Sequence, residues 1–253
     1  MIPVEYAALV HGFFEMLGLA VGAATYRRAR RQMGGRGILA PGEFAIAVGC
    51  VFGAAIGNKA VFWIEMPHLF VQYWQTPAVL FGGQSMVGGL LGGLLGVEIA
   101  KKLTGITRST GDAFVMPVLL GLAIGRVGCF LAGLEDGTFG VATNLPWGID
   151  FGDGVRRHPT QLYEIAFAGV LAWVLSRWRG RLVDRPGLLF KLMLVAYLAW
   201  RLAVDDIKPV PYVYPLGLSG IQWVCVLGLA VYLPILVRVW RRAENDIDGS
   251  KAA

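Results

Sequence analysis

Seven long apolar stretches recur along the chain, and they constrain its fold more than any other feature. Each is long enough to cross about 30 Å of hydrocarbon as a helix. Only 16% of the 253 residues are charged and 56% are hydrophobic, whereas soluble domains carry about 25% charged residues. We therefore expect an all-α membrane protein, a seven-helix bundle forming a single domain over residues 1–253. The stretches are residues 5–25, 43–65, 83–100, 113–132, 160–176, 187–204 and 216–237.

Basic residues alternate between the two sides of these stretches. The connections after stretches one, three and five, together with the C-terminal tail, hold 16 Lys and Arg residues, and the other connections hold only three. Because cytoplasmic loops are enriched in Lys and Arg, this pattern predicts an outside N-terminus and a cytoplasmic C-terminus. The net charge of +6 is then a topology signal, and it does not indicate binding to nucleic acid.

The connections predicted to lie outside have a different composition. Residues 66–82 contain no Lys or Arg and many aromatic residues, as expected of a segment at the lipid–water interface. Residues 133–159 are longer than a tight turn and rich in Gly, Asp and Thr. We expect approximately this second segment to form a small periplasmic cap.

Ionisable residues inside the apolar stretches are costly, by at least about 2.5 kcal/mol each, so they indicate a polar site. Several fall in or near the predicted outer half: His11, Arg126, Glu164, Tyr197 and Arg201. They predict a polar cavity that opens outward or sideways into the outer leaflet. Guanidinium groups grip phosphate bidentately and stay charged in a low dielectric. The two arginines therefore point to an anionic phospholipid as ligand or substrate.

A structural interpretation of the same residues stays open. Arg201 could form a salt bridge with Asp205 or with Glu15. His11 and Glu15 are spaced i, i+4 on one helical face, and a buried histidine held by a carboxylate is a common structural device. The cysteines at 50, 129 and 225 lie far apart and show neither a metal-ligand spacing nor a disulfide framework. The sequence spacing therefore predicts no metal site.

Three motifs resemble the signature region of the prolipoprotein diacylglyceryl transferases. They are GRVGCFLAG (125–133), TNLPWG (143–148) and HPTQLYE (158–164). The family typically reads GR-x-GNF, T-D-LPW and HPSQLYE at these places. The resemblance covers nearly the whole chain, and HPTQLYE together with the GR-x-G context is specific.

Further segments extend this resemblance. HGFFEMLG (11–18) falls where the family has a tyrosine-containing motif in its first span, and GGQSMVGGLLGG (82–93) is similar to GGMS-x-HGG-x-x-G. Tyr197-x-x-x-Arg201-x-x-x-Asp205 resembles its Y-x-x-x-R-F-x-x-E, and Ser219-x-x-Gln222 resembles the opening of its last span.

The resemblance implies a multi-pass transferase of the bacterial plasma (inner) membrane that uses no cofactor. It would move the diacylglyceryl group of phosphatidylglycerol to the lipobox cysteine thiol of a prolipoprotein, with release of glycerol phosphate. Its expected partners are phosphatidylglycerol or another anionic phospholipid, the prolipoprotein signal peptide and the membrane.

The family's roles carry over to matching positions. Arg126 and Arg201 would bind the lipid phosphate and stabilise charge on the leaving group, and Tyr197 would orient the head group. With His11, the two arginines form the expected catalytic set. The expected substrate contacts are Glu15, Cys129, Gly133, His158, Gln161, Tyr163, Glu164, Tyr197 and Asp205.

The chain departs from the family pattern at several polar positions. Val87 stands where the family has a histidine that is a candidate for activating the thiol, Cys129 replaces an asparagine, and His11 replaces the tyrosine. The family's acidic loop residue corresponds to Glu135 or Asp136.

Alternative hypotheses follow from these departures. In one, His11 with Glu15 supplies the base that position 87 lacks, because a thiol needs a base or a positive field to attack at neutral pH. In the other, a paralogue uses the same phospholipid site with a different acceptor, or binds lipid without catalysis.

Overall fold

The computed structural model describes residues 3–34, 37, 39–40, 42–80 and 82–251, and every predicted apolar stretch forms a helix there. The long helices are α1 (Val4–Gln32), α2 (Glu43–Glu65), α5 (Met86–Thr104), α6 (Val115–Ala132), α7 (Thr160–Trp178), α8 (Leu188–Val204) and α9 (Gly220–Lys251). The short elements are α3 (Pro67–Tyr73), α4 (Pro77–Leu80), the 3₁₀ turns η1 (Gly111–Phe114), η2 (Gly133–Asp136), η3 (Arg179–Leu182), η4 (Asp205–Ile207) and η5 (Pro215–Gly217), and strands β1 (Ile149–Asp150) and β2 (Arg156–Arg157).

The surface of the bundle is as apolar as a membrane protein requires. Within the described residues, four helical segments are long and apolar enough to cross a membrane, namely Val4–Gln32, Glu43–Glu65, Gly111–Asp136 and Gly220–Arg241. Large apolar side chains along α1 stand exposed, among them Leu9 at 70% and Phe13 at 62%. Such side chains are poorly placed in water and well placed against lipid. The fold is therefore that of an all-α membrane protein.

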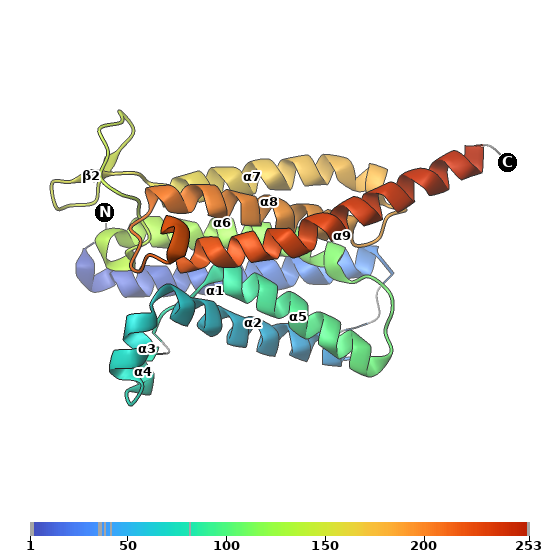
Figure 1. Cartoon of the computed structure of the whole chain (residues 1–253), viewed down its shortest axis with the longest axis horizontal. Coiled ribbons are helices and arrows are strands. Elements are labelled where there is room, and N and C mark those ends of the chain that lie inside the picture. The colour runs from blue at the N-terminus through green and yellow to red at the C-terminus, as the bar shows by residue number, and fades with distance from the viewer. Residues whose placement is uncertain (1–2, 35–36, 38, 41, 81, 252–253) are drawn as a thin grey trace.

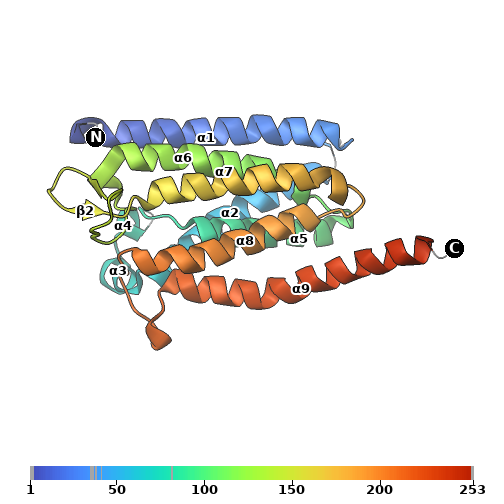
Figure 2. The ribbon, with the colours of Figure 1, turned by 90° about the horizontal axis from the view of Figure 1, so that it is seen from above.

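The long helices lie side by side in an elongated bundle (Figures 1 and 2). Helix α1 packs along α6, α6 packs on α7, and α8 packs on α9. The closest approach joins α2 and α5, where three glycines of each helix face each other. A Cβ on Gly53 or Gly92 would come within 3 Å of the other helix's backbone. The glycines at 88 and 92 therefore allow the two helix backbones to pack closely.

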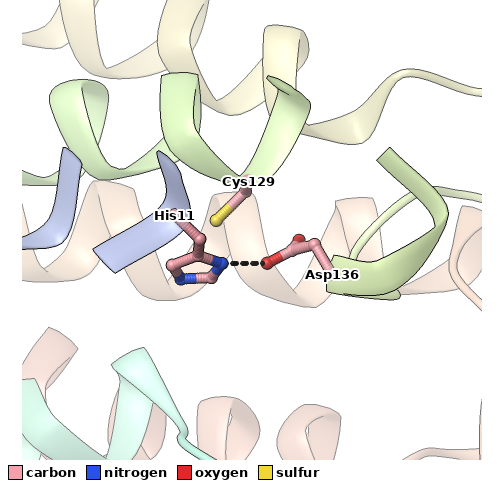
Figure 3. A group of neighbouring side chains, drawn as sticks. All are labelled: His11, Cys129 and Asp136. Atoms are coloured by element: carbon pink, nitrogen blue, oxygen red, sulfur yellow. Dashed lines mark ion pairs between the residues drawn. The ribbon is translucent and has the colours of Figure 1, made fainter. Parts of the chain in front are cut away.

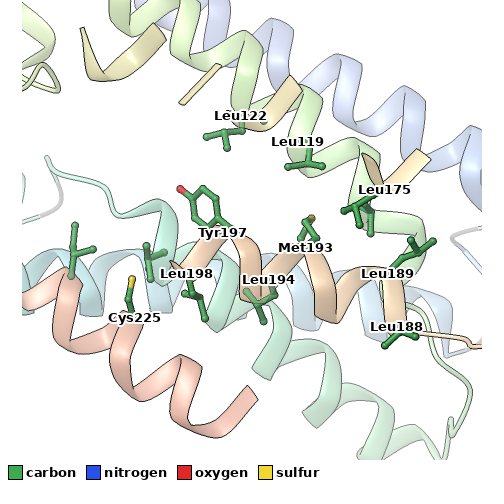
Figure 4. Close-up of a cluster of buried hydrophobic side chains, with 14 of the residues drawn as sticks. Leu119, Leu122, Leu175, Leu188, Leu189, Met193, Leu194, Tyr197, Leu198 and Cys225 are labelled. Carbon is green, nitrogen blue, oxygen red and sulfur yellow. The ribbon is translucent and has the colours of Figure 1, made fainter. Parts of the chain in front are cut away.

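Helix α8 lies at the centre of the main hydrophobic core (Figure 4). Met193, Leu194 and Leu198 are almost completely buried on it, and they pack in one cluster with Leu119 of α6 and Leu175 of α7. The side chain of Asp112 in η1 accepts hydrogen bonds from the backbone N–H groups of 187 and 190 at 2.5 and 3.0 Å. This cap satisfies free N–H groups at the start of α8. The core and the cap hold fixed the helix that carries Tyr197 and Arg201.

Two of the connections that were predicted to lie outside, 66–82 and 133–159, gather at the end of the bundle where the N-terminus lies (Figure 1). Residues 66–82 include α3 and α4. Residues 133–159 form η2 and a short antiparallel β1–β2 hairpin, in which Ile149 pairs with Arg157. In the hairpin turn, Asp150 Oδ1 accepts hydrogen bonds from the N–H groups of Gly152 and Gly154, whose φ angles are positive. The hairpin adds strand structure that the sequence did not predict.

Candidate functional site

Arg126 of α6 and Glu164 of α7 form an ion pair between the helices, with 2.6 Å between Nε and Oε2. The side chains are 14% and 3% exposed. The second carboxylate oxygen of Glu164 accepts a hydrogen bond of 3.0 Å from the Tyr197 hydroxyl of α8. Glu164 therefore links three helices at one point. A buried pair of this kind is stable only when its remaining polar atoms also find partners.

Arg201 is held by a second buried carboxylate. Its Nη2 lies 3.0 Å from Oδ1 of Asp205, one turn along the chain. The other oxygen of Asp205 accepts a hydrogen bond from the Ser219 hydroxyl at the start of α9. Gln222 in turn accepts from the Ser219 backbone N–H at 2.8 Å and donates to Asp206 at 2.6 Å. The predicted Arg201–Asp205 salt bridge is confirmed. The Ser219-x-x-Gln222 motif holds Asp205 in place by hydrogen bonds from the start of α9.

Buried polar atoms without a partner remain in this region. Among the described residues, Arg201 Nη1 and both side-chain amide atoms of Gln161 have no hydrogen-bond partner. Arg126 Nε faces Glu164 without meeting hydrogen-bond geometry. A buried polar group left unpaired costs about 1–3 kcal/mol, so several in one place indicate groups that a ligand completes. Three of the four atoms carry N–H donors, which suits an anion.

Lys208 adds a third cation to the same region, and the sequence did not single it out for the site. It lies just after η4. Its charge acts on the Glu164 carboxylate, as the charges of Arg126 and Arg201 do. Burial, with a smaller contribution from the nearby arginines, lowers the pKa of Lys208 to about 8. A lysine whose charge is this costly is one that a bound anion would stabilise.

A second cluster joins α1, α6 and η2 (Figure 3). His11 Nδ1 lies 2.9 Å from Asp136 Oδ1, and His11 Nε2 lies 3.2 Å from Glu15 Oε1. The Cys129 thiol completes the cluster, because one donor atom from each of His11, Cys129 and Asp136 lies within 4.8 Å of the others. Arg126 Nη1 donates to Cys129 Sγ at 3.7 Å, so the guanidinium touches both clusters.

The structure resolves which acid of the loop belongs to the site. The sequence left Glu135 and Asp136 as alternatives; Asp136 turns inward to His11, whereas Glu135 is exposed. Gly133 ends α6 with a φ of 66° and redirects the chain into η2. This backbone turn is the role that the structure gives to Gly133, and a side chain there would be strained.

Two predicted site residues lie apart from these clusters. His158 Nδ1 is 3.2 Å from the Tyr163 hydroxyl, which also accepts a hydrogen bond of 2.8 Å from Trp147. These contacts tie the cap to the first turn of α7. Trp147 and Leu145 stand exposed beside them. Contacts of His158 and Tyr163 with a substrate remain a prediction.

Most of the predicted site residues are brought together by the fold. His11, Glu15 and Cys129 meet in one cluster, and Arg126, Glu164 and Tyr197 meet in the other. The Tyr197 hydroxyl donates a hydrogen bond to Glu164, and its role in orienting the head group remains a prediction. Two residues of the site were not selected from the sequence. The Ser219-x-x-Gln222 motif could have indicated Ser219, and the position of Lys208 three residues after Asp205 could have indicated Lys208.

The architecture and the two buried clusters define a membrane protein with a polar, cation-rich site among its helices. Comparison with known proteins identifies its family: the family model described as prolipoprotein diacylglyceryl transferase matches residues 4–238. A phosphatidylglycerol–prolipoprotein diacylglyceryl transferase of Nitratidesulfovibrio vulgaris is 30% identical over 254 residues, covering 96% of this chain and 92% of the relative. A relative of the same name from Methylobacillus flagellatus is 31% identical, over 79% of this chain and 76% of the relative. Another from Methylococcus capsulatus is also 31% identical, over 90% of this chain and 86% of the relative.

The chain belongs to the prolipoprotein diacylglyceryl transferase family, as the sequence motifs predicted. It is thus a member of a family of bacterial membrane transferases of lipoprotein biosynthesis.

Proposed function

We propose that this protein transfers the diacylglyceryl group of phosphatidylglycerol to the lipobox cysteine of a prolipoprotein. One observation carries the proposal: Arg126 and Arg201 are buried near the common carboxylate of Glu164, and Nη1 of Arg201 has no hydrogen-bond partner among the described residues. The two non-bridging oxygens of a phosphodiester would bind such guanidinium groups bidentately. The names of the relatives supply the donor and acceptor that such a site would serve.

The reaction is a displacement at carbon. The acceptor sulfur forms a bond to the carbon of the diacylglyceryl group that carries the phosphate, and the bond between that carbon and the phosphate oxygen breaks. The electron pair leaves on the phosphate oxygen, and glycerol phosphate is released. Arg126 and Arg201 stabilise the charge that grows there, which is where fixed cations in a low dielectric are most effective. Gln161 would donate to the same phosphate or to the glycerol hydroxyls.

His11 is the proposed group for activating the acceptor thiol. Position 87 carries a buried valine, so no imidazole is available there. His11 lies next to Cys129, and Arg126 connects this cluster to the phosphate site. Both ring nitrogens of His11 already face carboxylates, those of Glu15 and Asp136. His11 can therefore take a thiol proton only after one of these contacts opens.

We further propose that all seven long helices cross the inner membrane, with the N-terminus and the cap outside. The supporting observations are the alternation of basic connections and the common position of 66–82, the cap and the N-terminus at one end of the bundle. Reporter fusions after each helix test this topology. Periplasmic activity for a fusion after α6 and cytoplasmic activity for one after α5 are expected, and the reverse pattern would contradict it.

The transfer is tested with purified protein, phosphatidylglycerol and a lipobox peptide, with mass spectrometry as the readout. The expected product is the peptide plus one diacylglyceryl group, and a peptide with serine in place of cysteine should stay unmodified. Arg126→Ala and His11→Ala should each abolish turnover while the protein remains folded.

A second function is favoured by Val87 and Cys129, which replace two polar residues of the family pattern. In this alternative the same phospholipid site serves another acceptor, or binds lipid without reaction. Release of glycerol phosphate without any peptide product would identify another acceptor. Tight lipid binding with neither product, while a curated relative reacts in parallel, would identify a lipid-binding protein.

A further inference from the structure

The cluster of His11, Cys129 and Asp136 has the composition and the spacing of a zinc site. Nitrogen, thiolate sulfur and carboxylate oxygen are the three ligand types that Zn²⁺ uses in proteins, with bonds of about 2.0–2.3 Å. One donor atom of each residue already lies within 4.8 Å of the others. Figure 3 shows the three side chains pointing toward one another from separate elements.

Each of the three residues is also held by a further partner, which is typical of a built metal site. His11 Nδ1 faces the cluster, while His11 Nε2 contacts the Glu15 carboxylate at 3.2 Å. Metal-bound histidines usually donate their second ring N–H to a carboxylate in this way. The Thr138 hydroxyl donates to Asp136 Oδ2, which leaves Oδ1 directed at His11. Arg126 donates to Cys129 Sγ at 3.7 Å, a contact that orients the sulfur.

The number of ligands distinguishes two kinds of zinc site. Structural sites are closed by four protein ligands, whereas catalytic sites have three and leave one position for water or substrate. The group comprises three residues among the described part of the chain. His11 is 29% exposed at its side chain, whereas Asp136 is 3% exposed. An incoming group therefore has its access on the His11 side.

We propose that His11, Cys129 and Asp136 bind one Zn²⁺, and that its open position takes the acceptor thiol. This inference rests on the transferase function proposed above and specifies how its acceptor is activated. A thiol that coordinates Zn²⁺ loses its proton, which passes to solvent. The bound thiolate sulfur then attacks the carbon of the diacylglyceryl group that carries the phosphate. The electron pair of the breaking carbon–oxygen bond leaves on the phosphate of glycerol phosphate. The thioether product is neutral and a weaker ligand, so it dissociates.

The metal would account for two departures from the family pattern together. Cys129 replaces an asparagine and His11 replaces a tyrosine, so two metal ligands appear in the chain that lacks the histidine at position 87. A metal-bound acceptor needs no separate base. With zinc bound, His11 is a metal ligand and does not serve as the base for the acceptor thiol.

The test uses the full-length protein in detergent, stripped with a chelator and titrated with Co²⁺ as a spectroscopic stand-in for Zn²⁺. We expect one Co²⁺ per chain, with a thiolate-to-cobalt charge-transfer band. Cys129→Ser should remove that band, and Asp136→Asn should weaken binding. Glu15→Gln should reduce the affinity by about tenfold or more, as loss of an outer partner does. Cys50→Ser and Glu135→Gln are matched controls that should bind as wild type does.

Size-exclusion chromatography and thermal unfolding confirm that each variant is folded, and Glu15→Gln tests the site even if Cys129→Ser is unstable. Binding that is absent, or a band that survives in folded Cys129→Ser, would overturn the proposal. Transfer activity separates the two claims. A metal-free protein that transfers at the full rate overturns the zinc role and leaves the transferase function intact. A Cys129-dependent metal site in a protein without transfer supports the site and counts against the transferase function.

Discussion

Arg126 contacts a side chain of each buried cluster: its Nε lies 2.6 Å from Glu164 and its Nη1 lies 3.7 Å from Cys129. This one guanidinium connects the proposed phosphate site among α6, α7 and α8 to the His11 cluster beside α1. A donor lipid and an acceptor thiol bound at the two clusters would therefore meet at Arg126. The arrangement explains why two sets of polar residues lie so close inside an apolar bundle.

Glu164→Gln should damage both stability and activity. It removes the charge that compensates buried Arg126, and it leaves one carbonyl oxygen where two carboxylate oxygens served Arg126 and Tyr197. Breaking a buried ion pair by removing one partner costs about 3–5 kcal/mol. Unfolding in detergent by heat measures the loss, and the peptide assay measures activity. The double variant Arg126→Met with Glu164→Gln should regain part of the stability but no activity. Recovery of activity in the double variant would show that Arg126 has only a structural role.

Tyr197→Phe tests whether the tyrosine acts through Glu164 or on the head group. The ring is buried and stays packed in the variant, so stability should fall by about 1.5–3 kcal/mol for the lost hydrogen bond to a charged carboxylate. If the hydroxyl positions Glu164, kcat should fall with little change in KM for phosphatidylglycerol. A large rise in KM with an unchanged kcat would show instead that Tyr197 binds the head group.

The activity should depend on the charge of Lys208. Its pKa is lowered to about 8, so the cation is present below pH 8 and is lost as the pH rises through this value. We propose that the cation assists anion binding, so wild-type activity should decline above pH 8. Lys208→Arg keeps the charge and should hold its activity to higher pH. The rate of Lys208→Arg is divided by the wild-type rate at each pH from 6 to 10. Because the ionisation of the acceptor thiol affects both rates equally, it does not change this ratio. A ratio that stays constant would contradict the role of Lys208.

Gly92→Ala should destabilise the bundle. Its Cβ would come within 3 Å of the backbone carbonyl of Gly53 and force α2 away from α5. Overpacking of this kind costs about 1–3 kcal/mol. Gly89→Ala is the matched control, because its Cβ would have nothing closer than 4.0 Å. Thermal unfolding in the same detergent should separate the two variants. Equal melting temperatures would show that the helices do not approach as closely as the structure describes.

Ser219→Ala should loosen the carboxylate that holds Arg201. The hydroxyl donates to Asp205 and accepts from the backbone N–H of Gln222 at 3.0 Å. Leaving these buried groups unpaired costs about 1–3 kcal/mol, and transfer should slow because Arg201 loses its fixed position. Ser176→Ala, which removes an exposed hydrogen bond to Trp173, should leave both unchanged. If Ser219→Ala behaves like this control, the link between α9 and Arg201 has no role in the site.

The sequence predicted the helices and the family, because these depend on local patterns. Apolar length and the motif HPTQLYE are visible without knowing any contact. It also placed Arg201 with Asp205, which are one helical turn apart. The contact of His11 with Cys129 and Asp136 could not be predicted. It depends on how α1 is rotated against α6 and on the turn at Gly133, which aims Asp136 inward.

The position of Tyr197 shows the same limit. Its spacing from Arg201 predicts a shared helical face, but its partner Glu164 lies on another helix and is set by the packing of α7 on α8. Lys208 was not selected from the sequence, because its burial near four charged site residues appears only in the fold.

The central claim is a displacement that links lipid cleavage to thioether formation, and measuring both products of one reaction tests it most directly. Purified protein with phosphatidylglycerol and a lipobox peptide should release glycerol phosphate and diacylglyceryl peptide in equal amounts. Arg126→Ala and Arg201→Ala, if folded, should yield neither product. Absence of both products from the wild-type protein, while a curated relative forms them under the same conditions, would contradict the account.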